Sequence, residues 1–225
     1  MTTFQETALL LAAAWLLIVA IRFRTSTVVL IGGLVAIAVY IAAAVAYGAV
    51  TVGELGFVST SWVKTIGYAV VWTGVMLAYS PVADWLATQI FAKPPTLDAF
   101  RAIQESTLKL VAGIAVAWVL GGFLEELVFR GVLLRSIEDG LTAWFPAPIS
   151  SGIAVLAAAI GAGLIHFYQG PRAMVIITQL SILFGVLFVI SGHDLLAVML
   201  CHGLYDTIAF TRFAQKKSKY STLER

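Results

Sequence analysis

Long apolar runs separated by short polar segments make up almost the whole chain. The runs cover residues 7–21, 27–50, 66–91, 110–137, 148–168, 172–191 and 194–213. A helix needs about 20 mainly apolar residues to cross the hydrocarbon core of a bilayer. The pattern therefore predicts an all-α fold, a polytopic membrane helix bundle of about seven transmembrane helices. An eighth helix results if the run at 110–137 is split or if the segment 51–65 enters the membrane.

Two polar segments between the runs have patterns of their own. Residues 51–65 contain glycine, serine and threonine together with Glu54 and Lys64, which predicts a loop or an interfacial helix. Trp62 suits the headgroup level of the membrane. Residues 96–108 interleave charged and apolar side chains, and Thr96 is a suitable helix cap. This second segment is expected to be an amphipathic helix.

The composition agrees with a membrane protein. Of the 225 residues, 60% are hydrophobic and 12% are charged, whereas a soluble domain has about a quarter of its residues charged. Because the runs use nearly all of the chain, residues 1–225 are expected to form a single integral-membrane domain. The net charge of +2 is too small to indicate nucleic acid as a partner. The single cysteine, Cys201, excludes an internal disulfide.

Lysine and arginine residues distinguish the two sides of the membrane, because cytoplasmic loops carry an excess of both. Basic residues follow the first, third, fifth and seventh runs, whereas the opposite side has only Lys64 and Arg135. We therefore expect a multi-pass protein of the cell membrane with a cytoplasmic C-terminus, where residues 214–225 form a basic tail. The basic residues assigned to the cytoplasmic side are Arg22, Arg24, Lys93, Arg101, Lys109, Arg172, Arg212, Lys216, Lys217, Lys219 and Arg225.

The run at 110–137 contains Glu125, Glu126 and Arg130 among apolar residues. A charged side chain at the centre of a bilayer costs roughly 2.5–3.5 kcal/mol on insertion scales, so these three need partners or a function. Glu126 and Arg130 have the i,i+4 spacing of a helical ion pair, whereas Glu125 lies about 100° away round the helix. One interpretation is a structural ion pair that holds helices together. The other is a working carboxylate, Glu125, beside a structural one.

Three further ionisable residues, His166, His202 and Asp206, lie in apolar runs. His202 and Asp206 are one helical turn apart, so they share a helix face. At about 1.5 Å per residue, Glu125, His166 and His202 reach similar depths in the membrane when helix tilt is allowed for. A shared polar site is therefore expected. Two histidines and a carboxylate can bind a catalytic metal or activate water without one, and the spacing does not decide between them.

Taken in order, these motifs resemble those of a known family. The sequence holds Glu125-Glu126-x-x-x-Arg130, a glycine-rich run that leads to His166, and His202-x-x-x-Asp206. This arrangement resembles the CAAX-protease and bacteriocin-processing (CPBP, or Abi) family of intramembrane proteases. The resemblance implies a helix bundle with a water-filled cavity that opens toward the cytoplasm, and it places the catalytic core at about residues 97–213.

The resemblance also implies a role for each polar residue. Glu125 would be the general base that activates water, and His166 would help to position that water. His202 and Asp206 would stabilise the oxyanion, while Glu126 and Arg130 would brace the first motif. The family is commonly described as metalloproteases, so a zinc ion held by Glu125, His166 and His202 stays open beside a metal-free mechanism.

Two positions depart from the family pattern. Ala162 stands where a phenylalanine usually precedes the histidine of the second motif, which would widen or repack that wall of the cavity. Asp206 stands where eukaryotic relatives commonly have asparagine. An ionised Asp206 could orient His202, whereas a protonated one could itself donate to an oxyanion.

The leading functional hypothesis is an intramembrane endopeptidase that acts on a membrane-associated peptide or protein. A catalytically silent scaffold or bacteriocin-immunity protein of the same fold is the second hypothesis. A proton-coupled transporter is the third, but it predicts two related halves with broken helices, and the sequence shows no such internal symmetry. The expected partners are the lipid bilayer and the substrate, and the sequence gives no signal of an oligomeric state.

Overall fold

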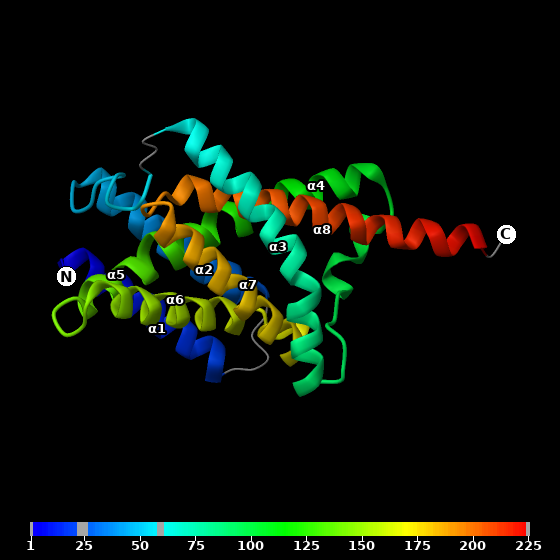
Figure 1. Ribbon diagram of the computed structural model, residues 1–225, viewed down its shortest axis with the longest axis horizontal. Coiled ribbons are helices and arrows are strands. Elements are labelled where there is room, and N and C mark those ends of the chain that lie inside the picture. Colours follow the sequence, from blue (N-terminus) through cyan, green and yellow to red (C-terminus); the bar gives the residue numbers. More distant parts are fainter. Residues whose placement is uncertain (1, 22–26, 58–60, 224–225) are drawn as a thin grey trace.

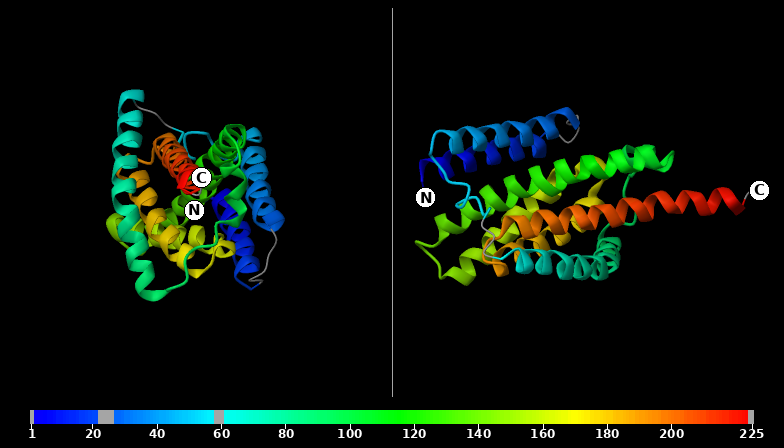
Figure 2. Two further views of the ribbon diagram at one scale, coloured as in Figure 1. Left: turned by 90° about the vertical axis from the view of Figure 1, so that its right-hand side faces the viewer. Right: turned by 90° about the horizontal axis from the view of Figure 1, so that it is seen from above.

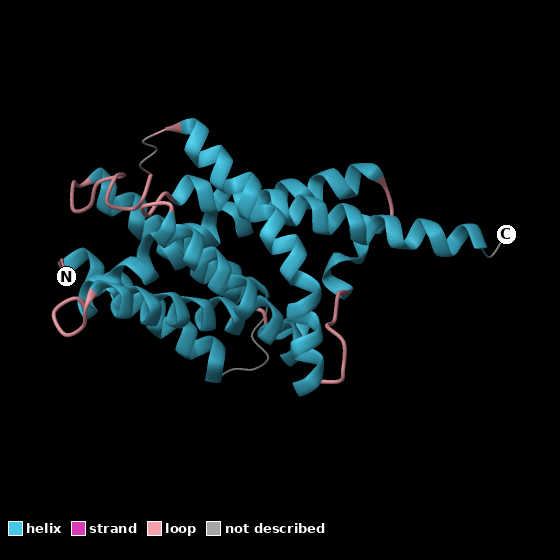
Figure 3. Cartoon of the chain, in the orientation of Figure 1, coloured by secondary structure: helices cyan, strands magenta, loops and turns pink. Residues whose placement is uncertain are grey.

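The computed structural model describes residues 2–21, 27–57 and 61–223, and the regular structure in these ranges is helical (Figures 1 and 3). This confirms the predicted all-α fold class. The longer helices are α1 (Thr3–Ile21), α2 (Thr27–Ala46), α3 (Trp62–Ile90), α4 (Thr107–Ala117), α5 (Arg135–Leu141), α6 (Ala147–Leu164), α7 (Pro171–Ile190) and α8 (Leu195–Leu223). The shorter ones are η1 (Asp98–Gln104), η2 (Trp118–Glu125), η3 (Leu127–Leu134) and η4 (Phe167–Gln169).

Six helical segments of the described ranges are long and apolar enough to cross a membrane. They are α1, α2, α3, the continuous segment Thr107–Leu141, α6 and α7. The chain is therefore a multi-pass membrane protein, as the apolar runs predicted. The seventh predicted span lies in α8, which is not among the six because His202, Asp206 and Arg212 interrupt its apolar run. The predicted basic tail continues α8 as far as Leu223, and its side chains from residue 216 onward lie outside the described part, as do Arg22 and Arg24.

The helices form a bundle in which α8 and the segment Thr107–Leu141 are central. In Figure 2 (right), α1 and α2 lie along one edge and α3 lies along the opposite edge. α8 contacts α3, α4 and η2, while α6 and α7 pack against each other and against η3. Figure 1 shows the two chain termini at opposite ends of the long axis, with α8 extending beyond the bundle toward the C-terminus.

The segment Thr107–Leu141 runs through 35 residues and combines α4, η2, η3 and α5. The helical turns on both sides of Glu126 are π-helical, with i→i+5 hydrogen bonds in place of the usual i→i+4 pattern. Such π-helical turns inside α-helices occur frequently at functional sites. The carboxylates of this segment therefore lie in its least regular part.

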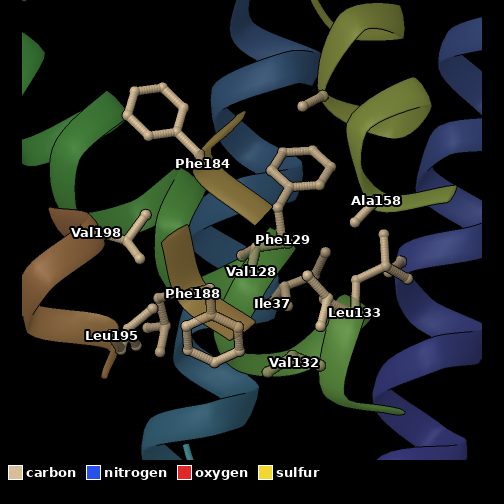
Figure 4. Close-up of a cluster of buried hydrophobic side chains, with 14 of the residues drawn as sticks. Ile37, Val128, Phe129, Val132, Leu133, Ala158, Phe184, Phe188, Leu195 and Val198 are labelled. Atoms are coloured by element: carbon tan, nitrogen blue, oxygen red, sulfur yellow. The ribbon is translucent and has the colours of Figure 1, made fainter. Parts of the chain in front are cut away.

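The η3 helix lies at the centre of the apolar core (Figure 4). All eight of its residues are buried. Lipid tails are as apolar as leucine, so a side chain gains little by moving from lipid into the protein core. Close van der Waals packing between the helices therefore holds such a core together. The side chains that pack here include Phe129, Val132 and Leu133 of η3, Ile37 of α2, Ala158 of α6, Phe184 and Phe188 of α7, and Leu195 and Val198 of α8.

The predicted loop or interfacial helix at 51–65 is a loop up to Phe57, and α3 already begins at Trp62. Glu54 accepts hydrogen bonds from the Thr51 backbone N–H (2.6 Å) and hydroxyl (2.8 Å), which hold the pKa of its carboxyl below the ordinary value. Gly56 has a φ of +92°, and its carbonyl accepts from Leu195 N–H at 2.8 Å. The loop is thus fixed against the start of α8.

The predicted amphipathic helix at 96–108 is wrong. The chain instead forms η1, a short 3₁₀-helix, and then starts α4 at Thr107. The physical reason is Ser106, whose side chain accepts from Lys109 N–H at 3.2 Å and caps a new helix there. The residue at the N-cap position of η1 is Leu97 and not Thr96, whose N–H donates to the Gln169 carbonyl at 2.8 Å.

Candidate active site

Glu126 and Arg130 form the predicted ion pair at the centre of the bundle. Arg130 Nη1 donates to Glu126 Oε1 at 3.2 Å and lies 3.1 Å from Oε2. The Glu126 side chain is 0% exposed and that of Arg130 is 2% exposed. Arg130 Nη2 also donates to the Ser181 hydroxyl (2.6 Å) and carbonyl (2.7 Å), and its guanidinium lies 5.5 Å from the Phe184 ring centroid. The pair therefore ties Thr107–Leu141 to α7.

Glu126 has a second partner that its local sequence spacing did not reveal. His202 Nδ1 donates to Glu126 Oε1 at 2.6 Å. The imidazole also stacks on Phe184, with 4.6 Å between ring centroids. Glu126 therefore fixes the orientation of His202, and α8 is joined to the same buried network as α7.

The other ring nitrogen of His202 faces Asp206. Nε2 lies 3.5 Å from Asp206 Oδ2, across the predicted one-turn spacing. Gly121 of η2 borders this place, since a Cβ added there would lie 3.1 Å from His202 Nε2 and 3.2 Å from Asp206 Oδ2. Gly121 thus lies directly against the two polar groups, and any side chain at this position would crowd them.

Small residues bring η2 and α8 close together at this point. A Cβ on Gly203 would lie 2.4 Å from the Trp118 ring, and one on Gly122 would lie 3.3 Å from the Met199 carbonyl oxygen. Such close approach through small residues is typical of membrane helix interfaces. The indole Nε1 of Trp118 donates to the Thr207 hydroxyl at 3.0 Å and adds a polar contact between the two helices.

Glu125 differs from its neighbour Glu126 in its exposure and in its hydrogen bonding. Its side chain is half-buried, and no described residue hydrogen-bonds to it or pairs with it. It nevertheless interacts electrostatically with His202 and Asp206 of α8 and with Tyr168 of η4. The structure thus has, at adjacent positions, a buried carboxylate paired with Arg130 and His202 and a half-buried carboxylate without a hydrogen-bonded partner among the described residues.

His166 reaches the same region from a turn. α6 ends at Leu164, so His166 lies before η4 and not inside the predicted fifth span at 148–168. Its Nδ1 donates to the Ala162 carbonyl at 2.8 Å, and no described residue bonds to its Nε2. The imidazole stacks on Tyr168 at 5.9 Å and interacts electrostatically with Asp206.

The wall around Ala162 is closely packed. Ala162 is 3% exposed. A Cβ on the neighbouring Gly163 would lie 2.0 Å from Thr178 Oγ1 and 2.9 Å from the Met174 carbonyl oxygen, both of α7. Helix α7 therefore packs closely against the small residues of α6. Of the two predicted effects, a wider cavity wall or a repacked one, the structure shows the repacked wall.

The residues present do not fit a metal centre. In the part of the chain that the structure describes, no three His, Cys, Asp or Glu side chains come together as ligands of one ion. Glu125, His166 and His202, the ligands considered for zinc, form no such group, so we derive no step through a metal.

Cys201 is buried, and its sulfur accepts from the Thr73 hydroxyl at 3.5 Å.

The site contains residues that the sequence interpretation missed. Ser181 and Phe184 on α7 hold Arg130 and His202, and Tyr168 on η4 stacks on His166. Ser181 carried a usable signal, because it is a polar residue inside the apolar run 172–191. Phe184 carried none, since phenylalanine is expected anywhere in such a run.

The fold and the site define a class of protein: a polytopic, all-helical membrane protein with a carboxylate–histidine cluster between its central helices. Residues 107–208 match the family model described as type II CAAX prenyl endopeptidase Rce1-like. The match confirms the predicted resemblance to the CAAX-protease family, and the matched segment includes every residue of the candidate site. Comparison with the curated proteins and with the solved structures finds no significant match.

Proposed function

We propose that this protein is an intramembrane endopeptidase that hydrolyses a peptide bond of a membrane-associated substrate with water activated by Glu125. The contrast between the two adjacent glutamates carries the proposal. Glu126 is 0% exposed and bound to Arg130 and His202, whereas Glu125 has no bonded partner in the described chain and stays partly accessible. A general base must be free to accept a proton and within reach of water.

The remaining groups supply the other parts of a hydrolytic site. Glu125 takes a proton from water while the water oxygen attacks the carbonyl carbon, and His166, through its free Nε2, positions that water. The carbonyl electrons move to the oxygen, and donors aimed at this oxyanion stabilise the transition state. The carbon–nitrogen bond then breaks, and Glu125 returns the proton to the leaving nitrogen.

His202 and Asp206 are placed to act on the oxyanion. When His202 carries a proton on each ring nitrogen, Nδ1 donates to Glu126 and Nε2 is left to donate beside Asp206. Glu126 and Arg130 contribute by fixing the imidazole rather than by contacting the substrate.

The substrate class follows from the family and from the membrane setting. Family members of this type are described as CAAX prenyl endopeptidases, so a peptide anchored by a lipid-modified cysteine is a suitable first probe. We propose that the C-terminus of the protein is cytoplasmic, so that substrates reach the site from that side.

The proposed function is tested by comparing the membrane proteomes of cells that carry the native protein or its Glu125→Gln variant. Uncleaved forms of one or more membrane-associated proteins should accumulate with the variant, and the new peptide ends should be absent. Cells that carry a Glu54→Gln variant serve as the control, because Glu54 lies in the 51–57 loop and its side chain, among the described residues, bonds to Thr51 alone. Identical cleavage products in all three cell lines would favour a silent scaffold over a peptidase.

Replacing His202 with alanine should lower the turnover of a cleavable reporter by about 10²–10³ while the substrate still binds, as for a donor lost from an oxyanion hole. Turnover and KM measured in vesicles check this. A His193→Asn variant is the control. His193 lies in the turn between α7 and α8 and bonds to Glu138 of α5, which is not one of the site residues named above. Undiminished turnover in His202→Ala would remove this residue from the mechanism.

Replacing Asp206 with asparagine should leave turnover close to that of the native protein. Glu126 already fixes the His202 ring through Nδ1, so Asp206 is not needed to orient it. An amide can donate to an oxyanion in place of a protonated carboxyl group. A steady-state assay checks this, and a large fall in turnover would show instead that the carboxylate of Asp206 orients His202.

A further inference from the structure

Tyr168 lies in η4, in the turn between the spans α6 and α7, and none of the roles described above uses it. Its ring stacks on His166 with 5.9 Å between centroids and 28° between planes. The residue is 38% exposed, so the ring is not packed away in the core. Its hydroxyl interacts electrostatically with Glu125 and with Asp206. Tyr168 thus contacts one histidine of the candidate site and lies close enough to Glu125 and Asp206 to interact with their charges.

Gln169 determines which hydrogen bonds the Tyr168 hydroxyl can make. The Gln169 side-chain amide donates to the phenol oxygen at 3.0 Å. Gln169 is itself 8% exposed and held by its backbone, because its N–H donates to the His166 carbonyl (2.9 Å) and its carbonyl accepts from Thr96 N–H (2.8 Å). Gln169 is therefore held in place by its backbone, and its side-chain amide is the donor to the phenol oxygen.

The proton of the phenol is left without a partner. Since the amide of Gln169 occupies the acceptor side of the oxygen, the hydroxyl hydrogen points elsewhere, and no described residue accepts it. Partial burial raises the pKa of Tyr168 above its ordinary value, and the charges of Glu125 and Asp206 raise it further. The hydroxyl therefore keeps its proton at neutral pH and remains a donor.

We propose that Tyr168 is a substrate-binding residue of the site, whose hydroxyl donates a hydrogen bond to a backbone carbonyl of the bound peptide next to the scissile bond. The inference rests on the proposed peptidase function and extends it. A bound peptide strand offers carbonyl oxygens that need donors when they leave water. A neutral phenol is suited to this task beside two carboxylates, since it donates a hydrogen bond without adding a further negative charge.

The test uses purified protein in phospholipid vesicles and a quenched fluorescent peptide that ends in a farnesylated CAAX sequence. Tyr168→Phe keeps the ring stack on His166 and removes only the donor. KM should rise about 3- to 10-fold with kcat unchanged, because a neutral hydrogen bond lost equally from the ground and transition states weakens binding alone. Tyr68→Phe is the matched control, since Tyr68 on α3 is also 38% exposed and has no described partner.

Gln169→Glu provides a second variant that leaves the phenol in place. A carboxylate at this position accepts the phenol proton instead of donating to the oxygen, so the hydroxyl should turn away from the substrate. The rise in KM should match that of Tyr168→Phe, and the double variant should show no further rise, because both changes remove one hydrogen bond. Thermal unfolding checks that each variant is folded.

Binding in an inactive background separates this inference from the proposed function. The affinity of the same peptide is measured for Glu125→Gln and for Glu125→Gln with Tyr168→Phe, on a time scale too short for the residual cleavage expected of these variants. A 3- to 10-fold weaker affinity of the double variant supports the role of Tyr168. Equal affinities, no binding by either protein, or a fall in kcat with KM unchanged overturns it. Cleavage by the native protein but not by Glu125→Gln upholds the peptidase function in either case.

Discussion

Replacing Glu125 with glutamine is expected to lower cleavage of a membrane-associated reporter peptide by about 10²–10⁴, the usual contribution of a general base. Glutamine keeps the shape of the side chain but cannot accept a proton from water. The fold should be unaffected, because no described group hydrogen-bonds to Glu125 or pairs with it. Initial rates in vesicles give the activity, and thermal unfolding in detergent gives the stability.

Asp98→Asn is a suitable control for the Glu125 variant. Asp98 pairs with Arg101 on the surface of η1, where the two side chains are 65% and 76% exposed. Surface pairs of this kind contribute little, about 0–1 kcal/mol, so activity and unfolding temperature should both be retained. Cleavage by Glu125→Gln at the native rate would show that this carboxylate is not the base.

Glu126→Gln should have the opposite effect, a large loss of stability. The change leaves the buried Arg130 guanidinium without its counter-charge and His202 without its carboxylate acceptor. Breaking a buried pair on one side typically costs about 3–5 kcal/mol. The yield of folded protein and the midpoint of thermal unfolding should fall together.

The comparison between the two glutamates is informative because they are adjacent and chemically identical. Measured in one detergent and at one pH, Glu125→Gln should resemble the native protein in stability and Glu126→Gln should not. Equal losses of folded protein in both variants would contradict the division into a working and a structural carboxylate.

The sequence predicted the helices and the identity of the polar residues for a clear physical reason. Apolar runs long enough to cross a bilayer define the spans, and ionisable residues within them are costly enough to stand out. Glu125, Glu126, Arg130, His202 and Asp206 were found in this way. The ion pair of Glu126 with Arg130 also followed from the sequence, because the i,i+4 spacing is local.

Contacts between distant segments could not be predicted in the same way. The bond from His202 to Glu126 joins residues 76 positions apart, and nothing in either local sequence specifies it. The close packing of η2 against α8 through Gly122 and Gly203 likewise joins segments that are far apart in the sequence. The prediction for the segment 96–108 was wrong because it took Thr96 as the cap of one helix, whereas Ser106 caps α4 further along the chain.

The most direct test of the account is a single turnover of the reporter peptide in ¹⁸O-labelled water, with the purified protein in excess. If Glu125 activates water, the new carboxyl group of the product contains the label after this first turnover, and Glu125 contains none. Mass spectrometry of the product and of the fragment that contains Glu125 measures both. Label in the Glu125 side chain, with an unlabelled product, would show that the carboxylate attacks the peptide itself and would contradict the water-activating role.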